Sequence, residues 1–221
     1  MSYCGIYQAQ ISYSLSPAGP VLVSSGSGNK MHPELPDNTF LMSWDGERYA
    51  YVIPGSSIKG VMRHYLYRMF SDKKADNLFG TLGSKSKISV SDAFADMDTV
   101  KTTVRHSTAI NSVSQSAKNG SLNNMQAVVA GIFDGNIHLT DVKQEEIAVV
   151  LKAINAIENG EIHIGGKISR GFGRMKVKDF HITISEGYDE NLQPIVTEDI
   201  HSLSDAIAAH NFSSASVGGN A

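Results

Sequence analysis

The chain has 221 residues, of which 41% are hydrophobic and 19% are charged, as in a globular protein of one large domain or two small ones. Its formal net charge of -3 excludes a global basic field, so any contact with nucleic acid must come from a local patch. A single cysteine, Cys4, excludes an internal disulfide and a cysteine-based zinc cluster, and no apolar run reaches the roughly 20 residues of a membrane span.

These properties predict a cytoplasmic protein that contacts no membrane. The eight histidines show no His-x-x-x-His pair or comparable ligand spacing. Because a zinc site built within one element repeats its ligands at such spacings, the sequence predicts no dedicated structural metal site. A transient Mg²⁺ held by a carboxylate and phosphate is compatible with the composition.

The N-terminal part begins with an expected strand over Gly5 to Leu15, where β-branched and aromatic residues are frequent. From Ser16 to about Ala50 the chain is rich in proline, glycine and serine, and connections of this length are usually functional or disordered. Within it, Asp45-Gly46 between two short apolar stretches predicts a hairpin turn.

The stretch from Ile53 to Phe70 predicts an amphipathic helix with a capped start. Ser56 or Ser57 is the expected N-cap. An apolar stripe at helical spacing predicts a face packed on the core, comprising Ile58, Met62, Tyr65, Leu66 and Met69. Lys59 and Arg63 lie one turn apart beside this stripe, so the helix start suits a phosphate group. An ordinary capped helix with solvated charges is the alternative.

The middle of the chain predicts strands around a protruding arm. A helix is expected to end at Asn77 to Gly80, and a short strand is expected over Ile88 to Phe94. The polar stretch from Lys101 to Met125, with its Asn119-Gly120 turn signal, predicts an arm or hairpin with Leu122 and Met125 as its apolar tip. One strand with a bulge at Gly131 is expected over 126–139.

The C-terminal part predicts a second helix and a glycine-rich loop. Asp141 is the expected cap of a helix over Val142 to Asn159, which ends at Gly160. The loop over 164–174 leads into a strand over 175–184, and a short helix is expected near 202–210. The small, polar tail over 213–221 is expected to be disordered.

The order of these elements predicts an α+β fold. Strand, helix, strand, strand, helix, strand is the β-α-β-β-α-β order of a ferredoxin-like core. The expected domain covers residues 1–185, with insertions at about 16–50 and 101–125, and residues 186–221 form a partly disordered extension. Since many functions share this fold, it does not select one.

Three stretches together resemble a known family. They are IPGSSIKG over 53–60 followed by Arg63, TAINSVSQSA over 108–117 followed by AGIF over 130–133, and GGKISRGFGR over 165–174. Their order resembles the RAMP (repeat-associated mysterious protein) superfamily, and most closely the repeated backbone subunit of type III CRISPR effector complexes. The resemblance spans roughly residues 5–184.

The resemblance implies an RNA-recognition-motif-like core whose copies stack into a filament along a guide RNA. Each copy would extend a thumb that interrupts pairing between guide and target, and the arm with Asn119, Gly120, Leu122 and Met125 would be that thumb. Implied partners in this antiviral ribonucleoprotein of prokaryotic cytoplasm are the guide RNA, the target RNA, further copies of the chain, and the large, small and end-capping RAMP subunits.

The resemblance also implies an endonuclease activity, a metal-dependent hydrolysis of target RNA at regular intervals. Asp37 occupies the place of the family's catalytic aspartate, with Asp45 and Glu47 as second choices. His32 and His106 are candidate helpers. Asp37 would act as the base or as a ligand of Mg²⁺ or another divalent cation, and no organic cofactor is expected.

The implied RNA-binding residues come from the first and third stretches. Glycines let backbone approach phosphates, and the cations add charge. The set comprises Ser56, Ser57, Lys59, Arg63, Gly165, Gly166, Lys167, Ser169, Arg170, Gly171 and Arg174. A turn-rich hairpin with solvated cations is the alternative. The sequence departs from the family at Ser112, where an arginine is usual, and at 24–28, which lacks the usual Gly-Gly start.

The sequence and this resemblance therefore leave three alternative functions. The first is a guide-binding subunit that cleaves target RNA. The second is a structural subunit that binds guide RNA without cleaving. The third is an endoribonuclease that processes the guide precursor.

Overall fold

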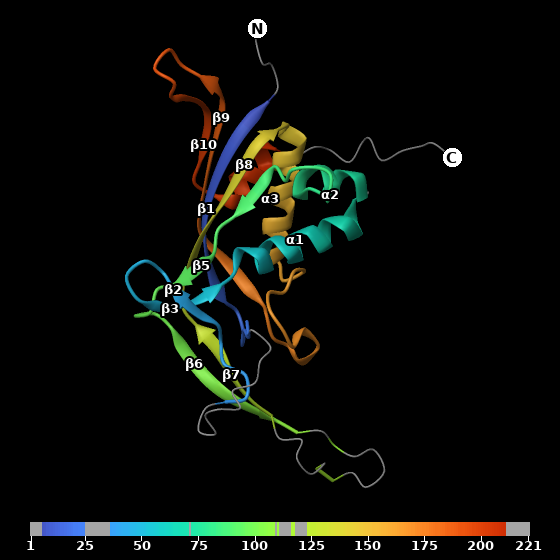
Figure 1. Ribbon diagram of the computed structural model, residues 1–221, viewed down its shortest axis with the longest axis vertical. Coiled ribbons are helices and arrows are strands. Elements are labelled where there is room, and N and C mark those ends of the chain that lie inside the picture. Colours follow the sequence, from blue (N-terminus) through green and yellow to red (C-terminus); the bar gives the residue numbers. More distant parts are fainter. Residues whose placement is uncertain are drawn as a thin grey trace, which may run out of the picture.

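The structure, a computed structural model, describes residues 6–24, 36–70, 72–108, 110, 116–117 and 123–210. A twisted antiparallel sheet carries helices on one face, and a separate two-stranded arm projects from one end (Figure 1). The predicted α+β class is confirmed. No helix in these ranges is long and apolar enough to cross a membrane.

The long strand β1 (Tyr7–Pro17) lies at the centre of the sheet. It pairs antiparallel with β8 (Phe133–Val142) on one side and with β9 (Met175–Tyr188) on the other. The order of neighbouring strands across the sheet is β10-β9-β1-β8-β5-β3-β2, and β4 also pairs with β8. The remaining strands of this sheet are β2 (Met42–Trp44), β3 (Tyr49–Ile53), β4 (Ile88–Val90), β5 (Ala93–Ala95) and β10 (Pro194–Ile200).

Apolar stripes hold the helices on the sheet. The helices are α1 (Gly55–Met69), α2 (Asp72–Phe79), α3 (Gln144–Glu158) and α4 (Leu203–Ala209), with a 3₁₀ turn, η1, at Ile168–Arg170. The expected stripe of α1 is buried at Ile58, Met62 and Leu66, but Met69 is 59% exposed because α1 ends there. In α3 every expected stripe residue is buried: Ile147, Val150, Leu151, Ile154 and Ile157.

The predicted arm is a hairpin formed by β6 (Lys101–Ser107) and β7 (Asn123–Ala130). The single strand expected over 126–139 was wrong, because β7 belongs to the arm and β8 to the main sheet. Gly131, at φ +143, turns the chain between them, and a Cβ there would lie 3.1 Å from the Val100 side chain. The turn residues Asn119 and Gly120 and the tip residue Leu122 lie outside the described ranges.

Both expected helix caps were wrong. At α1 the N-cap is Pro54, without a side-chain cap, and Asp92 Oδ1 accepts the Gly55 N–H at 2.8 Å. At α3 the N-cap is Lys143, whose N–H donates to Glu146 Oε2 at 2.9 Å, while Asp141 still belongs to β8. Asp92 is 37 residues from Gly55, so only the folded chain brings this carboxylate to the helix start.

The chain beyond residue 185 continues the fold. β9 runs on to Tyr188, β10 adds an edge strand, and α4 packs against α3. Ser202 caps α4 by accepting the Asp205 N–H, at the place where a short helix was predicted. The expected tail over 213–221 lies outside the described ranges.

Two glycines of α1 give a matched test of this packing. A Cβ at Gly55 would collide with the carbonyl oxygen of Val90 and lie 2.6 Å from that of Ser91, whereas a Cβ at Gly60 meets nothing within 4 Å. We expect Gly55→Ala to lower the free energy of unfolding by about 3 kcal/mol through overpacking. Gly60→Ala should raise it by up to about 1 kcal/mol through helix propensity. Denaturant unfolding measures both, and equal effects would contradict this packing.

Candidate nucleic-acid interface

Strand β7 of the arm is bordered by two segments from the long N-terminal connection. Val21 and Val128 exchange backbone hydrogen bonds of 2.9 and 3.0 Å. Further along, Asn38 N–H donates to Asn124 O at 3.1 Å, and Gln126 N–H donates to Asn38 O at 2.8 Å. The edge of β7 that faces away from β6 is therefore hydrogen-bonded to Val21 and Asn38, which fixes the loop that carries Asp37.

Asp37 is exposed and lies beside the outer end of the β6–β7 pairing, where His106 is opposite Asn124. Residues 108–122 connect the two strands at this end, and we call the region around Asp37, Arg105, Asn124 and Arg170 the arm base. Asp37 Oδ2 accepts the Asn124 N–H at 2.7 Å. His106 Nδ1 lies 2.6 Å from Asn124 Oδ1, so the predicted catalytic residue and one predicted helper share a neighbour. Within the described ranges, Asp37 Oδ1 accepts no hydrogen bond, which leaves one carboxylate oxygen for a ligand. His32 lies outside those ranges.

The second-choice carboxylate, Asp45, serves a turn. Its Oδ1 accepts the N–H groups of Glu47 and Arg48, each at 2.8 Å. These backbone bonds, first that from Arg48, lower the pKa of the Asp45 carboxyl below its ordinary value. Asp45 therefore shapes the β2–β3 hairpin that the sequence predicted at Asp45-Gly46. Glu47 lies exposed in the same turn.

The glycine-rich loop packs on the same N-terminal segment. Gly166 N–H donates to Leu22 O at 2.8 Å, and Gly173 N–H donates to Pro20 O at 2.9 Å. A Cβ at Gly165, which has φ +93, would collide with Leu22 O. Gly165 and Gly173 thus permit close approach of the chain to itself. At Gly171, which has φ +81, a Cβ would meet no atom within 4 Å, so the chain does not pack closely against this glycine.

Two arginines join this loop to the arm. Arg170 Nη1 donates to Ser107 Oγ at 3.1 Å, and the Arg105 guanidinium lies 5.6 Å from the centre of the Phe172 ring. Beneath them is a small apolar cluster of Leu22, Met125, Ala127 and Phe172. Met125 is therefore a buried anchor of the arm base, so its expected place at the tip was wrong.

The other predicted RNA-binding residues of the loop have different surroundings. Lys167 and Ser169 are exposed beside Arg170. Arg174 lies against Gly160 at the end of α3, where a Cβ on that glycine would be 3.0 Å from Arg174 Nε. Gly160 itself has φ +75, as expected for a glycine that ends a helix.

The predicted residues of α1 have partners of their own. Lys59 Nζ donates to Ser86 Oγ and to Ile88 O, each at 2.8 Å, and partial burial, followed by the charge of Arg63, lowers its pKa. Arg63 pairs with Asp76 at 3.1 Å and bonds to Tyr67. The start of α1, with Ser56 and Ser57, faces the chain around Asp92. The structure therefore does not gather these residues at the arm base.

A groove of about 340 Å³ separates α1 from the chain that leads into η1. Its α1 side includes His64 and Arg68, and Ile168 lies on the other side, two residues from Arg170. Sequence reasoning missed both side chains. Their spacing was the available signal, because Gly60, His64 and Arg68 recur every four residues and so share one helix face.

A metal cluster does not form around Asp37 within the described part of the chain. Only one group of three His, Cys, Asp or Glu side chains there brings ligand atoms close enough for an ion, and it comprises His181, Asp199 and His201. Mg²⁺ is commonly held by one or two carboxylates together with substrate phosphates. An exposed carboxylate such as that of Asp37 is the kind of ligand that this arrangement uses.

Comparison with known proteins agrees with this architecture. No curated protein matched the sequence. Among solved structures, the chain resembles one described as the cryo-EM structure of the Type III-B Cmr-beta bound to cognate target RNA, with a TM-score of 0.62 and 14% identity. The match covers 79% of this chain and 60% of the other, so this chain spans about 60% of the length of the matched chain. At this identity, the likeness shows a shared fold.

The family model of the RAMP superfamily matches residues 18–176, a range that contains the Asp37 loop, α1, the arm and the glycine-rich loop. Since the match covers well over half of the sequence, the chain belongs to the RAMP superfamily.

Proposed function

We propose that this chain is a guide-RNA-binding backbone subunit of a type III CRISPR ribonucleoprotein and that it cleaves bound target RNA with Asp37. Copies of the chain would line up along the guide, beside the large, small and end-capping subunits. Membership of the RAMP superfamily supports this proposal, as does the fold shared with a chain of the Cmr-beta complex bound to target RNA.

The convergence at the arm base carries the proposal. Three segments far apart in sequence meet there: the Asp37 loop, β6 and β7 of the arm, and the glycine-rich loop. Arg105, Arg170 and Lys167 supply positive charge on a chain whose net charge is -3. Local positive charge beside an exposed carboxylate suits a polyanion that is to be cut, because phosphate contacts hold the strand in position.

The open face of the sheet is a less suitable RNA surface. Its side chains alternate with the buried ones and are small or polar, as at Gln10, Asn136 and His138. RNA-recognition motifs instead stack bases on aromatic side chains of the sheet. The proposed RNA path therefore follows the arm base and the groove beside η1.

The proposed cleavage uses the RNA's own 2′-hydroxyl. Its oxygen attacks the adjacent phosphorus and the bond to the 5′-oxygen breaks, which leaves a cyclic phosphate and a 5′-hydroxyl. Asp37 would take the hydroxyl proton, or would hold a Mg²⁺ ion against the phosphate while water takes that proton, and the departing 5′-oxygen would take a proton from water. His106 and Arg170 lie near enough to the arm base to assist, and the arm would displace the target nucleotide.

A purely structural subunit that binds guide RNA without cleaving is the second candidate. One observation favours it: Asp37 Oδ2 accepts the Asn124 N–H at 2.7 Å, which gives this side chain a structural role that requires no cleavage.

Co-purification tests the RNA-binding part of the proposal. We expect the chain, isolated with its native partners, to carry a discrete small RNA of uniform length that survives nuclease treatment. A preparation without bound RNA, or with heterogeneous RNA that nuclease removes, would contradict guide binding.

A further inference from the structure

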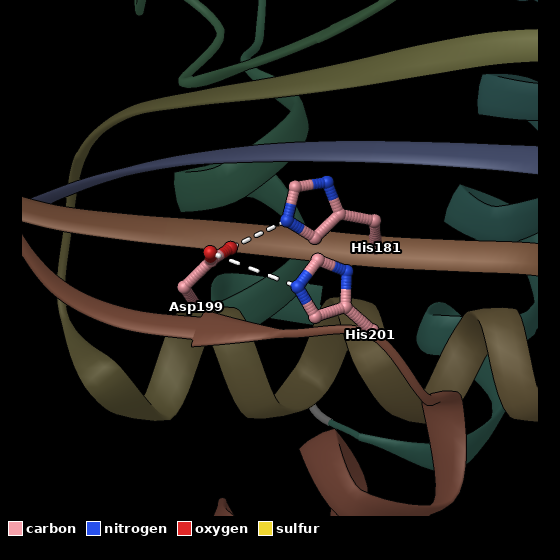
Figure 2. Close-up of side chains that lie close together, drawn as sticks. All are labelled: His181, Asp199 and His201. Atoms are coloured by element: carbon pink, nitrogen blue, oxygen red, sulfur yellow. Dashed lines mark hydrogen bonds and ion pairs between the residues drawn. The ribbon is translucent and has the colours of Figure 1, made fainter.

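Two histidines and an aspartate converge on the open face of the sheet, far from the arm. Figure 2 shows His181 on β9, with Asp199 and His201 on and just after β10. His181 Nε2 lies 2.5 Å from Asp199 Oδ1, and His201 Nε2 lies 3.7 Å from Asp199 Oδ2. The two imidazole rings are stacked, with centres 4.3 Å apart and planes at 7°.

The strand register produces this grouping. β10 pairs antiparallel with β9, with Asp199 opposite Thr183 and Ile200 opposite Ile182. The same register sets His201 across from His181, and side chains at opposite positions share a face with Cβ atoms about 5 Å apart. A slip by one residue would send the β10 side chains to the other face. The cluster therefore follows from the pairing of β10.

The geometry is close to that of a zinc site. The three ligand atoms lie within 4.8 Å of one another. Tetrahedral zinc with bonds of about 2.0–2.1 Å places its ligands about 3.3 Å apart, so the ion would replace the direct contact between His181 Nε2 and Asp199 Oδ1, and the two stacked rings would rotate to point their nitrogens at it. The cluster is partly open, with 75% of the His201 side chain exposed, so water has access to the fourth position.

The ligand set selects the ion. Two imidazoles and one carboxylate suit Zn²⁺ and neighbouring transition metals, whereas Mg²⁺ and Ca²⁺ prefer oxygen ligands alone. We propose that His181, Asp199 and His201 bind one divalent transition-metal ion of the Zn²⁺ class and that this ion clamps the edge strand β10 to β9. The proposal does not depend on RNA binding, because His181 is six residues along β9 from Met175, or about 20 Å from the glycine-rich loop.

Titration of the full-length protein tests the site. After treatment with a chelator and dialysis, the wild type should bind one Zn²⁺ per chain in calorimetry. His181→Ala and His201→Ala should each weaken this binding at least about 10-fold, as for groups that fix a metal. His138→Ala is the matched control, because it removes an exposed imidazole from the same face. Its affinity should equal that of the wild type.

A second readout follows β10 itself. Zn²⁺ should slow hydrogen exchange of the β10 amides in the wild type and in His138→Ala, but not in His201→Ala. His201 lies outside both strands, so its replacement should leave the fold intact. Absence of stoichiometric Zn²⁺ binding, or equal affinity in the wild type and both triad variants, would overturn the proposal.

Discussion

Replacement of Asp37 by asparagine should abolish target cleavage in an assembled complex while leaving RNA binding intact. The amide oxygen of the new side chain can still accept the Asn124 N–H that Asp37 Oδ2 accepts at 2.7 Å, so the loop keeps its place on β7. The negative charge needed to take a proton or hold Mg²⁺ is lost. We expect cleavage opposite this subunit to fall by about 100-fold or more, the usual contribution of a general base.

Asp45→Asn is the matched control for this prediction. Asp45 is also an exposed carboxylate ahead of α1, but its oxygen atoms are engaged by the turn and its pKa is lowered by backbone bonds, first that from Arg48. Its replacement should leave the cleavage rate within a factor of about two. Single-turnover cleavage of labelled target RNA with Mg²⁺ measures both variants. Unchanged cleavage by Asp37→Asn would eliminate Asp37 as the catalytic residue and favour the structural subunit.

Removal of the two arginines at the arm base should weaken RNA binding broadly across sequences. Arg105 and Arg170 are exposed, and phosphate contacts carry no sequence information. Each lost contact with a single strand should lower the slope of log affinity against log salt by about 0.7, so the double alanine variant should lose about 1.4. Binding to unrelated single-stranded RNAs at several salt concentrations measures this slope.

Two control variants separate charge from structure in this experiment. Ser107→Ala removes the 3.1 Å bond to Arg170 but keeps its charge, so the slope should not change. Lys143→Ala removes an exposed cation at the N-terminal end of α3, which does not belong to the arm base. This change should also leave the slope unchanged. We expect Lys59 and Arg63 to contribute less than Arg105 and Arg170, because Lys59 is partly buried and the charge of Arg63 is already paired with the Asp76 carboxylate. A slope that stays the same in the double variant would contradict the proposed RNA path.

Local patterns were enough for the fold class and for most helices. The apolar stripe of α3 and the glycine after it depend on residues within a few turns, and both lie where the sequence predicted them. The split of residues 126–139 into β7 and β8 was not visible, because Gly131 looks like a bulge until its neighbour Val100 is known. The cap of α1 was missed for a similar reason, since Asp92 reaches Gly55 only in the folded chain.

The candidate functional residues also show this difference between what local sequence predicts and what only the folded chain brings together. Asp37 and Arg170 were predicted from motifs, but their closeness to Asn124 and Ser107 depends on pairing over 87 and 63 residues. The grouping of His181, Asp199 and His201 was not visible in the histidine spacing of the sequence. No local spacing encodes it, because its members are brought together by the register of β9 and β10.

Mapping of RNA crosslinks tests most directly whether RNA lies at the base of the arm. Irradiation of the native ribonucleoprotein, followed by mass spectrometry, identifies the peptides joined to RNA. The proposed RNA path predicts crosslinks on β6 around Arg105 and on the glycine-rich loop around Arg170, with further ones on the α1 face that carries His64 and Arg68. Crosslinks confined to the open face of the sheet, around Gln10 and His138, would contradict it.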